Sequence, residues 1–334
     1  MTLPSWASDG PLASSLKSST ARLAIERKAR VALAAKVIPF GVSYLDDCLG
    51  GIHPTDLIVI SAASGAGKTT LGTLLAMSAA SKHRRVAFFA LEAYENEIEQ
   101  RLLFARMCQI DARHGRRYDI TFASWMMGQC GDVGWLEAKA ADELDLSGLR
   151  TLYRKESFGA DDITAQFLAI RSKVDLIILD HLHYVDYDGL SENAGLRKVV
   201  RAIRTAALEI QTPVIVIAHL RKRDAKTAGL IPPVDDIHGS SDIAKVATKI
   251  VVLAPMRGTQ FAASPPYISN TVMQVIKDRY AGTNGFAAMM EYDLRSQSYL
   301  DRYVVYKPTW GNKDLDKVDP DKVPRWAKRA ARTT

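Results

Sequence analysis

Short, fully apolar runs alternate along the chain with longer segments of helix-forming composition. Continuous apolar runs, rich in β-branched and aromatic residues, occupy 56–61, 86–91, 175–179 and 213–218. Segments typical of helices lie over 69–80, 95–108, 161–171 and 192–210. Further short strands are expected over 149–153, 249–253 and 271–276. Apolar strands separated by helices predict an α/β fold, with a mostly parallel sheet covered by helices on both faces.

Composition changes at both ends of this pattern. Residues 1–20 are rich in Ser, Ala, Gly and Pro, which indicates a flexible start. Residues 20–36 mix apolar and basic positions among strong helix formers and predict a basic amphipathic helix. Residues 307–334 are charged and contain prolines, so we expect a flexible tail that ends in a short basic helix, with Trp326 as an anchor. One large globular domain is therefore predicted over 37–306.

The net charge of +7 is unevenly distributed. Residues 1–36 hold six basic and two acidic side chains, and residues 307–334 hold eight and four. That leaves 30 basic and 31 acidic residues in between, so the central domain is nearly neutral. The basic ends suit contact with nucleic acid or an acidic partner, and they equally suit solvated tails.

Cysteine usage and hydropathy limit the class of protein. Cys48, Cys108 and Cys130 lie far apart and form no Cys-x-x-Cys pair, so a disulfide scaffold or a zinc knuckle is not expected. No apolar run approaches the roughly 20 residues that span a bilayer. We expect no membrane association and a cytoplasmic location in a bacterial or phage-infected cell. The Arg- and Ser-rich start also fits an organellar transit peptide, against which Asp9 and Glu26 argue.

A glycine-rich loop follows the first apolar strand and opens a helix. It contains Ser64, Gly65, Ala66, Gly67, Lys68, Thr69 and Thr70. In this context backbone N–H groups surround a phosphate chain, and the helix N-terminus adds its positive dipole end. We expect Lys68 to reach the β- and γ-phosphates of ATP and the Thr69 hydroxyl to bind Mg²⁺. The alternative, an ordinary strand-to-helix turn, does not require the Gly-Lys-Thr sequence.

Polar side chains stand at the ends of three other predicted strands. Asp180 is expected to hold Mg²⁺ through water. Glu92 is expected to orient and deprotonate the attacking water, because carboxylates act as general bases when they lie within reach. His219 is expected to sense the γ-phosphate. The alternatives are a structural histidine and a solvated Glu92, since further acids follow it at Glu95, Glu97 and Glu99.

Six segments together resemble the motor domain of ring-shaped replicative DNA helicases of the RecA-like class. They occupy 41–70, 88–103, 174–185, 213–224, 235–253 and 275–293, in the family's order. The resemblance is nearest to the bacteriophage primase-helicase and its mitochondrial relative Twinkle, with bacterial DnaB next. It implies a RecA-like P-loop NTPase core over residues 37 to about 306.

The resemblance implies roles for single residues. Glu92 falls on the catalytic glutamate, Asp180 on the magnesium-site aspartate, and His219 on a sensor that is glutamine in DnaB. Lys277 and Arg279 fall on a lysine and an arginine finger that reach the ATP of the neighbouring subunit.

Other implied roles concern the nucleotide base and the DNA. Tyr292 falls on an aromatic that stacks on the base, and Arg257 lies about two positions from a base-flanking arginine. Two loops fall on the DNA-facing surface of the ring and suit a sequence-independent grip on single-stranded DNA phosphates. The loops contain Arg221, Lys222, Arg223 and Lys226, and His238, Gly239 and Ser240. A solvated turn is the alternative for the first loop.

The leading hypothesis is a hexameric, ATP-driven helicase that moves along single-stranded DNA, with 5′→3′ direction implied by the resemblance alone. Only 36 residues precede the motor, so any primase is expected to be a separate protein. Residues 20–36 fall on a linker helix that packs on the adjacent subunit. The alternatives are a RecA- or KaiC-like ATPase that assembles without unwinding, and a nucleotide-dependent switch without catalysis.

Overall fold

The computed structural model describes residues 19–154, 158–187, 189–220, 230–237, 240–256, 267–280, 282–309 and 314–328. The chain divides into two compact units, Met1–Val37 and Ile38–Thr334. The first unit contains α1 (Ser19–Ala34), which corresponds to the helix expected over 20–36 and buries none of its residues. No helix in the described ranges is both long and apolar enough to cross a membrane.

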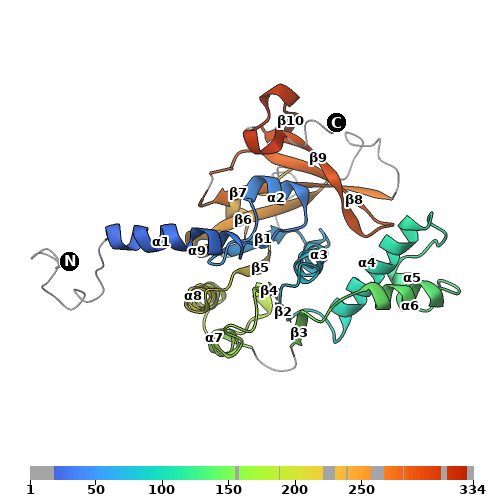
Figure 1. Cartoon of the computed structure of the whole chain (residues 1–334), viewed down its shortest axis with the longest axis horizontal. Coiled ribbons are helices and arrows are strands. Elements are labelled where there is room, and N and C mark those ends of the chain that lie inside the picture. The colour runs from blue at the N-terminus through green and yellow to red at the C-terminus, as the bar shows by residue number, and fades with distance from the viewer. Residues whose placement is uncertain are drawn as a thin grey trace, which may run out of the picture. The chain divides into compact units, whose positions relative to one another are not determined.

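The second unit is built on one ten-stranded sheet with the order β10-β9-β8-β7-β6-β1-β5-β4-β2-β3 (Figure 1). The strands are β1 (Leu57–Ala62), β2 (Val86–Ala90), β3 (Leu149–Tyr153), β4 (Leu176–Asp180), β5 (Val214–His219), β6 (Lys249–Pro255), β7 (Ile268–Asp278), β8 (Ala287–Asp293), β9 (Ser298–Pro308) and β10 (Leu315–Lys317). Strands β1 to β6 pair in parallel, and β7 to β10 continue the sheet from β6 in antiparallel pairs.

Helices cover both faces of the parallel part. The helices of this unit are α2 (Ser43–Leu49), α3 (Lys68–Ala80), α4 (Glu97–Arg113), α5 (Phe122–Met126), α6 (Gly134–Glu143), α7 (Ala160–Ala169), α8 (Glu192–Ile210) and α9 (Ser240–Val246). Of these, α6 packs on α4 in a separate small cluster, and α2 contacts β9 in the antiparallel part. Figure 1 shows α3 and the α7–α8 pair on opposite sides of the central strands. The α/β fold with a mostly parallel sheet is therefore confirmed.

Side chains of β1 alternate between two separate hydrophobic cores. Ile58 and Ile60 pack in the core that contains α3, whereas Leu57 and Val59 pack in the core that contains α8. Successive strand residues point to opposite faces, and both faces are covered, which explains why the strand is apolar at every position but Ser61. Burial on both sides fixes the register of β1, since a slip by one residue would exchange the two sets of side chains.

Part of the segment expected to be a flexible tail is packed structure. Strand β9 runs through residue 307 to Pro308, and β10 pairs with it. Trp326 lies with its ring 5.7 Å from that of Tyr44 and 6.3 Å from that of Phe286. The expectation of a tail from residue 307 is therefore wrong for 314–328, because these aromatic contacts attach the segment to the core. The role of Trp326 as an anchor agrees with these contacts.

A buried ion pair ties the start of β6 to the segment before β1. Lys249 and Asp56 both have 0% exposed side chains, and their Nζ and Oδ2 atoms lie 2.6 Å apart. Lys249 also donates to the carbonyl of Gly51 at 2.8 Å, and Asp56 accepts from the Thr248 hydroxyl at 2.7 Å. Both charges are thus paired and hydrogen-bonded, which is the condition under which buried charges are tolerated.

We expect Lys249→Met to lower the free energy of unfolding by about 3–5 kcal/mol, because it leaves the Asp56 carboxylate buried without a counter-charge. Urea unfolding followed by tryptophan fluorescence measures this. The double variant with Asp56→Asn should recover a large part of the loss, since no buried charge remains. Arg302→Ala, which removes an exposed pair with Glu291, is the control and should change stability by about 1 kcal/mol or less. A loss of only about 1 kcal/mol in Lys249→Met would contradict the conclusion that Lys249 is the counter-charge that Asp56 requires.

Candidate active site

The carboxyl ends of four parallel strands meet at one edge of the sheet. The register pairs Ala62 at the end of β1 with His219 at the end of β5, and Ala90 at the end of β2 with Asp180 at the end of β4. Ligands bind outside the carboxyl ends of the strands in open α/β sheets. A cavity of about 390 Å³ opens there, lined by Ser64, Gly65, Gly67, Lys68, Thr69, Thr70, Glu92, Ala93, Glu97, Arg101, Asp180 and His219.

The loop between β1 and α3 has the geometry expected of a phosphate-binding loop. Gly65 and Gly67 have φ values of +71° and +85°, which an L side chain rarely adopts, so both positions favour glycine. Lys68 is the first residue of α3, and its Nζ donates to the carbonyls of Ala62 at 3.0 Å and Ala63 at 2.9 Å. Burial lowers the pKa of Lys68, while the nearby charges of Asp180 and Glu92 raise it. Ala66 is buried and does not line the cavity.

Asp180 and Thr69 place a carboxylate and a hydroxyl side by side at this loop. The Asp180 side chain is 3% exposed, and burial raises its pKa to about 6, although a hydrogen bond from Thr69 acts in the opposite direction. Its Oδ1 atom is buried without a hydrogen-bond partner among the described residues. A carboxylate and a hydroxyl are the hard oxygen ligands that Mg²⁺ prefers, and an unsatisfied carboxylate oxygen fits such an ion. The residues present therefore fit a Mg²⁺ site.

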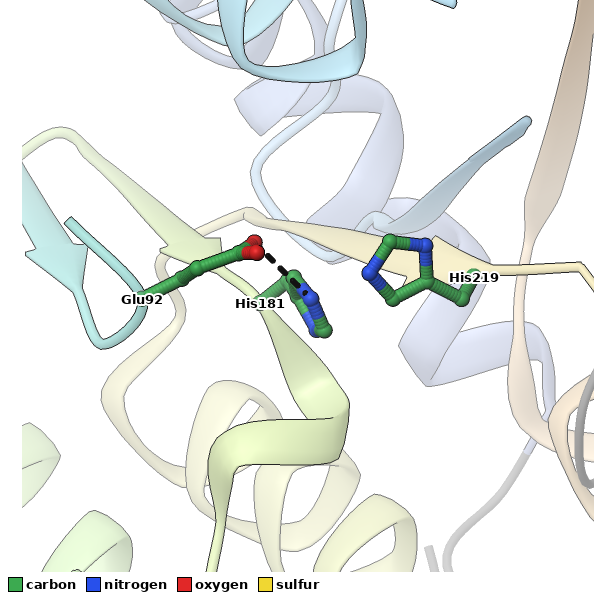
Figure 2. Close-up of side chains that lie close together, drawn as sticks. All are labelled: Glu92, His181 and His219. Carbon is green, nitrogen blue, oxygen red and sulfur yellow. Dashed lines mark ion pairs between the residues drawn. The ribbon is translucent and has the colours of Figure 1, made fainter. Parts of the chain in front are cut away.

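Figure 2 shows Glu92, His181 and His219 close together, and Glu92 and His219 line the cavity. His181 Nε2 lies 2.9 Å from Glu92 Oε2, and the rings of His181 and His219 lie edge to face with their centroids 4.0 Å apart. The facing nitrogen and carboxylate oxygen atoms of the three residues all lie within 4.8 Å of one another. Burial, followed by the nearby rings of His219 and His183, lowers the pKa of His181 to about 3, and burial also lowers the pKa of His219.

Two residues at or beside this cavity, His181 and Arg101, were not predicted from the sequence. His181 was missed because its contacts arise from the register of three strands and leave no local pattern. Arg101 lines the cavity from α4 and pairs with Glu97 at 2.7 Å. The spacing of these two residues by four positions at the start of a predicted helix was the available signal, since such pairs share one helix face.

Lys277 and Arg279 do not belong to this cavity. The backbone N–H of Arg279 donates to the carbonyl of Thr248 at 2.9 Å. In the register of the sheet, Lys249 at the start of β6 lies opposite Asp278 at the end of β7. Lys249 also pairs with Ile58 near the start of β1, whereas the phosphate-binding loop follows Ala62 at the end of β1. Because β7 is antiparallel, the two cations lie at the edge of the sheet opposite the loop. The four residue steps along β1 from Ile58 to Ala62 correspond to roughly 13 Å, which is the separation along the strand between the two edges.

Tyr292 is not among the residues that line the cavity. Its side chain is 8% exposed, its ring centroid is 5.0 Å from that of Tyr299, and its hydroxyl donates to Gln297 at 3.0 Å. Base stacking by Tyr292 therefore stays a prediction. The remaining predicted residues, Arg257, Arg221, Lys222, Arg223, Lys226, His238 and Gly239, lie outside the described residues, and of Ser240 only the backbone, at the start of α9, is described.

Comparisons with known sequences point to one family. The family model described as the DnaB-like helicase C terminal domain matches residues 37–295. The replicative DNA helicase DnaB of Leifsonia xyli subsp. xyli is 28% identical over 224 residues, which are 65% of this chain and 46% of that protein. DnaB of Geobacillus stearothermophilus is 25% identical over 225 residues, with the same coverage. The chain thus spans about half the length of the curated relatives it matches.

Solved structures share the fold of this chain. An ATPase domain of known structure superposes with a TM-score of 0.64 at 16% identity, over 91% of this chain and 100% of that chain. A DnaB-like replicative helicase, from a structural study of its interactions with primase, gives 0.58 at 15% identity over 91% and 68%. These likenesses show the fold, and the family model covers most of the sequence. The chain belongs to the DnaB-like helicase C-terminal domain family.

Proposed function

We propose that the chain is the motor of an ATP-dependent replicative DNA helicase that assembles as a hexameric ring around single-stranded DNA. One observation carries this proposal: the groups suited to ATP hydrolysis are divided between two opposite edges of the same sheet. The loop, Glu92 and Asp180 lie at one edge, and the cationic pair Lys277 and Arg279 lies at the other.

The first edge supplies the groups that bind the nucleotide and activate water. Lys68 and the loop backbone would bind the β- and γ-phosphates, and Thr69 and Asp180 would hold the divalent ion. When bound, Mg²⁺ neutralises phosphate charge. Glu92 lines the same cavity as Lys68, and its exposed carboxylate would accept a proton from water. His219 ends the strand beside the loop and senses the γ-phosphate.

The second edge supplies cations for a site outside their own subunit. Lys277 donates to the Ala244 carbonyl, and Arg279 is exposed; within the described ranges neither forms an ion pair. Burial and the nearby charges of Arg279 and Arg204 lower the pKa of Lys277, so this region accommodates an anion readily. A ring of like subunits would bring this edge to the nucleotide of a neighbour, with heterologous contacts that close.

The DNA-binding and partner roles follow the family resemblance. The loops with Arg221, Lys222, Arg223 and Lys226, and with His238, Gly239 and Ser240, would line the pore and contact phosphates. Tyr292 and Arg257 would flank the base. A separate primase would act with this motor, since the DnaB-like helicase of similar structure interacts with primase. The proposed location is the cytoplasm of a bacterial or phage-infected cell.

Asp180→Asn should abolish the Mg²⁺-dependent part of nucleotide affinity. With the unmodified chain, we expect Mg²⁺ to tighten binding of a fluorescent ATP analogue at least about tenfold, which corresponds to ~1.4 kcal/mol. With Asp180→Asn, the affinities in Mg²⁺ and in EDTA should agree within about a factor of two. Asp175→Asn, one residue before the same strand and paired with Arg85, is the control and should retain the Mg²⁺ effect. A full Mg²⁺ effect in Asp180→Asn would contradict this role.

Arg279→Ala should leave ATP binding within about twofold of the unmodified chain and lower DNA-stimulated hydrolysis by roughly 10³-fold, since an arginine finger contributes 10³–10⁵ in rate. Arg171→Ala, at an exposed arginine, is the control and should keep full activity.

Mixing variants tests whether the arginine acts on a neighbour. Arg279→Ala and Glu92→Gln are each expected to be inactive, but mixed rings contain sites with an intact Glu92 from one subunit and an intact Arg279 from the next. Recovered hydrolysis on mixing supports the divided site. Mixtures that stay as inactive as the separate variants indicate that Arg279 and Glu92 must belong to one subunit.

A further inference from the structure

His181 is the buried residue that joins the candidate catalytic glutamate to the sensor histidine. Its side chain is 1% exposed and lies between Glu92, which follows β2, and His219 at the end of β5 (Figure 2). The Nε2 atom of His181 lies 2.9 Å from Oε2 of Glu92. The planes of the His181 and His219 rings make an angle of 88°. The residue itself follows Asp180 at the end of β4. Groups from three strands therefore meet on one imidazole.

Backbone geometry fixes the proton on this ring. The Nδ1 atom of His181 accepts a hydrogen bond from the backbone N–H of His183 at 3.2 Å. A ring nitrogen that accepts carries no proton, so the imidazole is neutral and its single proton is on Nε2. Nε2 is buried and makes no hydrogen bond of normal geometry among the described residues, although Glu92 Oε2 lies only 2.9 Å from it. A buried N–H without an acceptor is unfavourable, which draws the Glu92 carboxylate to this position.

We propose that His181 is a positioning residue whose Nε2–H holds the Glu92 carboxylate in the orientation that Glu92 needs to activate water. The inference rests on the proposed ATPase function of the same site. A hydrogen bond to an ionised carboxylate is stronger than one between neutral groups, so it restricts the rotation of a side chain that is otherwise exposed. Glu92 is 43% exposed in its side chain and would sample several rotamers without this contact.

The same geometry argues against a transition-metal site. Two histidines and a carboxylate within 4.8 Å are a ligand set that zinc uses. A histidine that binds metal, however, normally donates its other ring N–H to an acceptor. His181 does the reverse, because its Nδ1 accepts from a backbone N–H and its Nε2 therefore carries the proton. In this tautomer the ring can donate a hydrogen bond through Nε2 to Glu92, but it has no free nitrogen that could bind a metal ion.

Contacts with His219 give the positioning residue a second consequence. The His219 ring lies against His181, and the His219 backbone N–H donates to His183 Nδ1 at 3.4 Å. Movement of His219 when the γ-phosphate leaves would therefore displace the imidazole on which Glu92 rests. The orientation of the base and the state of the nucleotide are coupled through His181, since packed rings transmit displacement.

The test uses three variants of the full chain in DNA-stimulated ATP hydrolysis. His181→Met removes the donor and should lower kcat by about 10–100-fold while KM for ATP changes less than about twofold, because misorientation affects the reacting group and not nucleotide binding. His181→Gln carries an amide N–H near the place of Nε2 and should recover a large part of kcat. His181→Asn carries its amide near the place of Nδ1 and should not. Equal rates for the Gln and Asn variants, or normal kcat in His181→Met, would overturn the proposal.

A double variant separates positioning from general support of the fold. In a Glu92→Gln background, single-turnover hydrolysis should change less than about twofold on adding His181→Met, because the group on which His181 acts is already lost. An additive loss would overturn the proposal, as would zinc retained by the purified chain and lost in His181→Met. If the unmodified chain does not hydrolyse ATP with DNA, the proposed function itself is wrong and this inference with it.

Discussion

The parallel pairing of β1, β5, β4 and β2 determines where the polar groups of the cavity lie. Parallel strands end at the same edge, so residues far apart in sequence, such as Glu92, Asp180 and His219, become neighbours without any loop having to bring them there. The register depends on burial of both faces of these strands, because two separate hydrophobic cores select opposite sets of side chains. Placement of the site is thus a consequence of the core.

The change from parallel to antiparallel pairing after β6 places Lys277 and Arg279 at the edge opposite the cavity, which is the basis for proposing that a second subunit completes the site. Strand β7 runs back along β6 and delivers Lys277 and Arg279 to the edge where β1 and β6 begin. Buried Lys249 and Asp56 hold this edge together, since they bind each other and the segments before β1. The phosphate-binding edge carries desolvated groups, with the pKa of Lys68 lowered and that of Asp180 raised to about 6. Such groups would gain partners from a charged nucleotide and the cation that we propose for this site.

Much of the fold was predictable because long periodic or fully apolar segments are unambiguous. The helix Glu192–Ile210 and the strand Leu149–Tyr153 have the expected bounds. Strands β8 and β9 were not predicted. Strand β9 mixes exposed and buried positions near the sheet edge and lacks a continuous apolar run. The packed segment 314–328 was also not predicted, because its attachment depends on contacts of Trp326 with residues distant in sequence.

The residues of the candidate site also divide into those that the sequence predicted and those that it did not. Lys68, Thr69, Glu92, Asp180 and His219 were found because each stands beside an apolar strand that predicts its position. His181 has no such signal apart from its neighbour Asp180, and its position between Glu92 and His219 appears only when three strand ends are in register (Figure 2). The direction of its hydrogen bond, from the backbone N–H of His183 to Nδ1, cannot be obtained from sequence, because it depends on the backbone conformation after β4.

Strand separation on a forked duplex tests the central claim most directly. The full chain, with ATP, Mg²⁺ and a fork that carries a single-stranded arm for loading, should release the labelled strand, and Arg279→Ala should not. This outcome follows if ATP held by one subunit is hydrolysed with the arginine of the next and hydrolysis drives movement along DNA. DNA-stimulated ATP hydrolysis by the unmodified chain without strand separation would contradict the account and favour an ATPase that assembles on DNA without unwinding it.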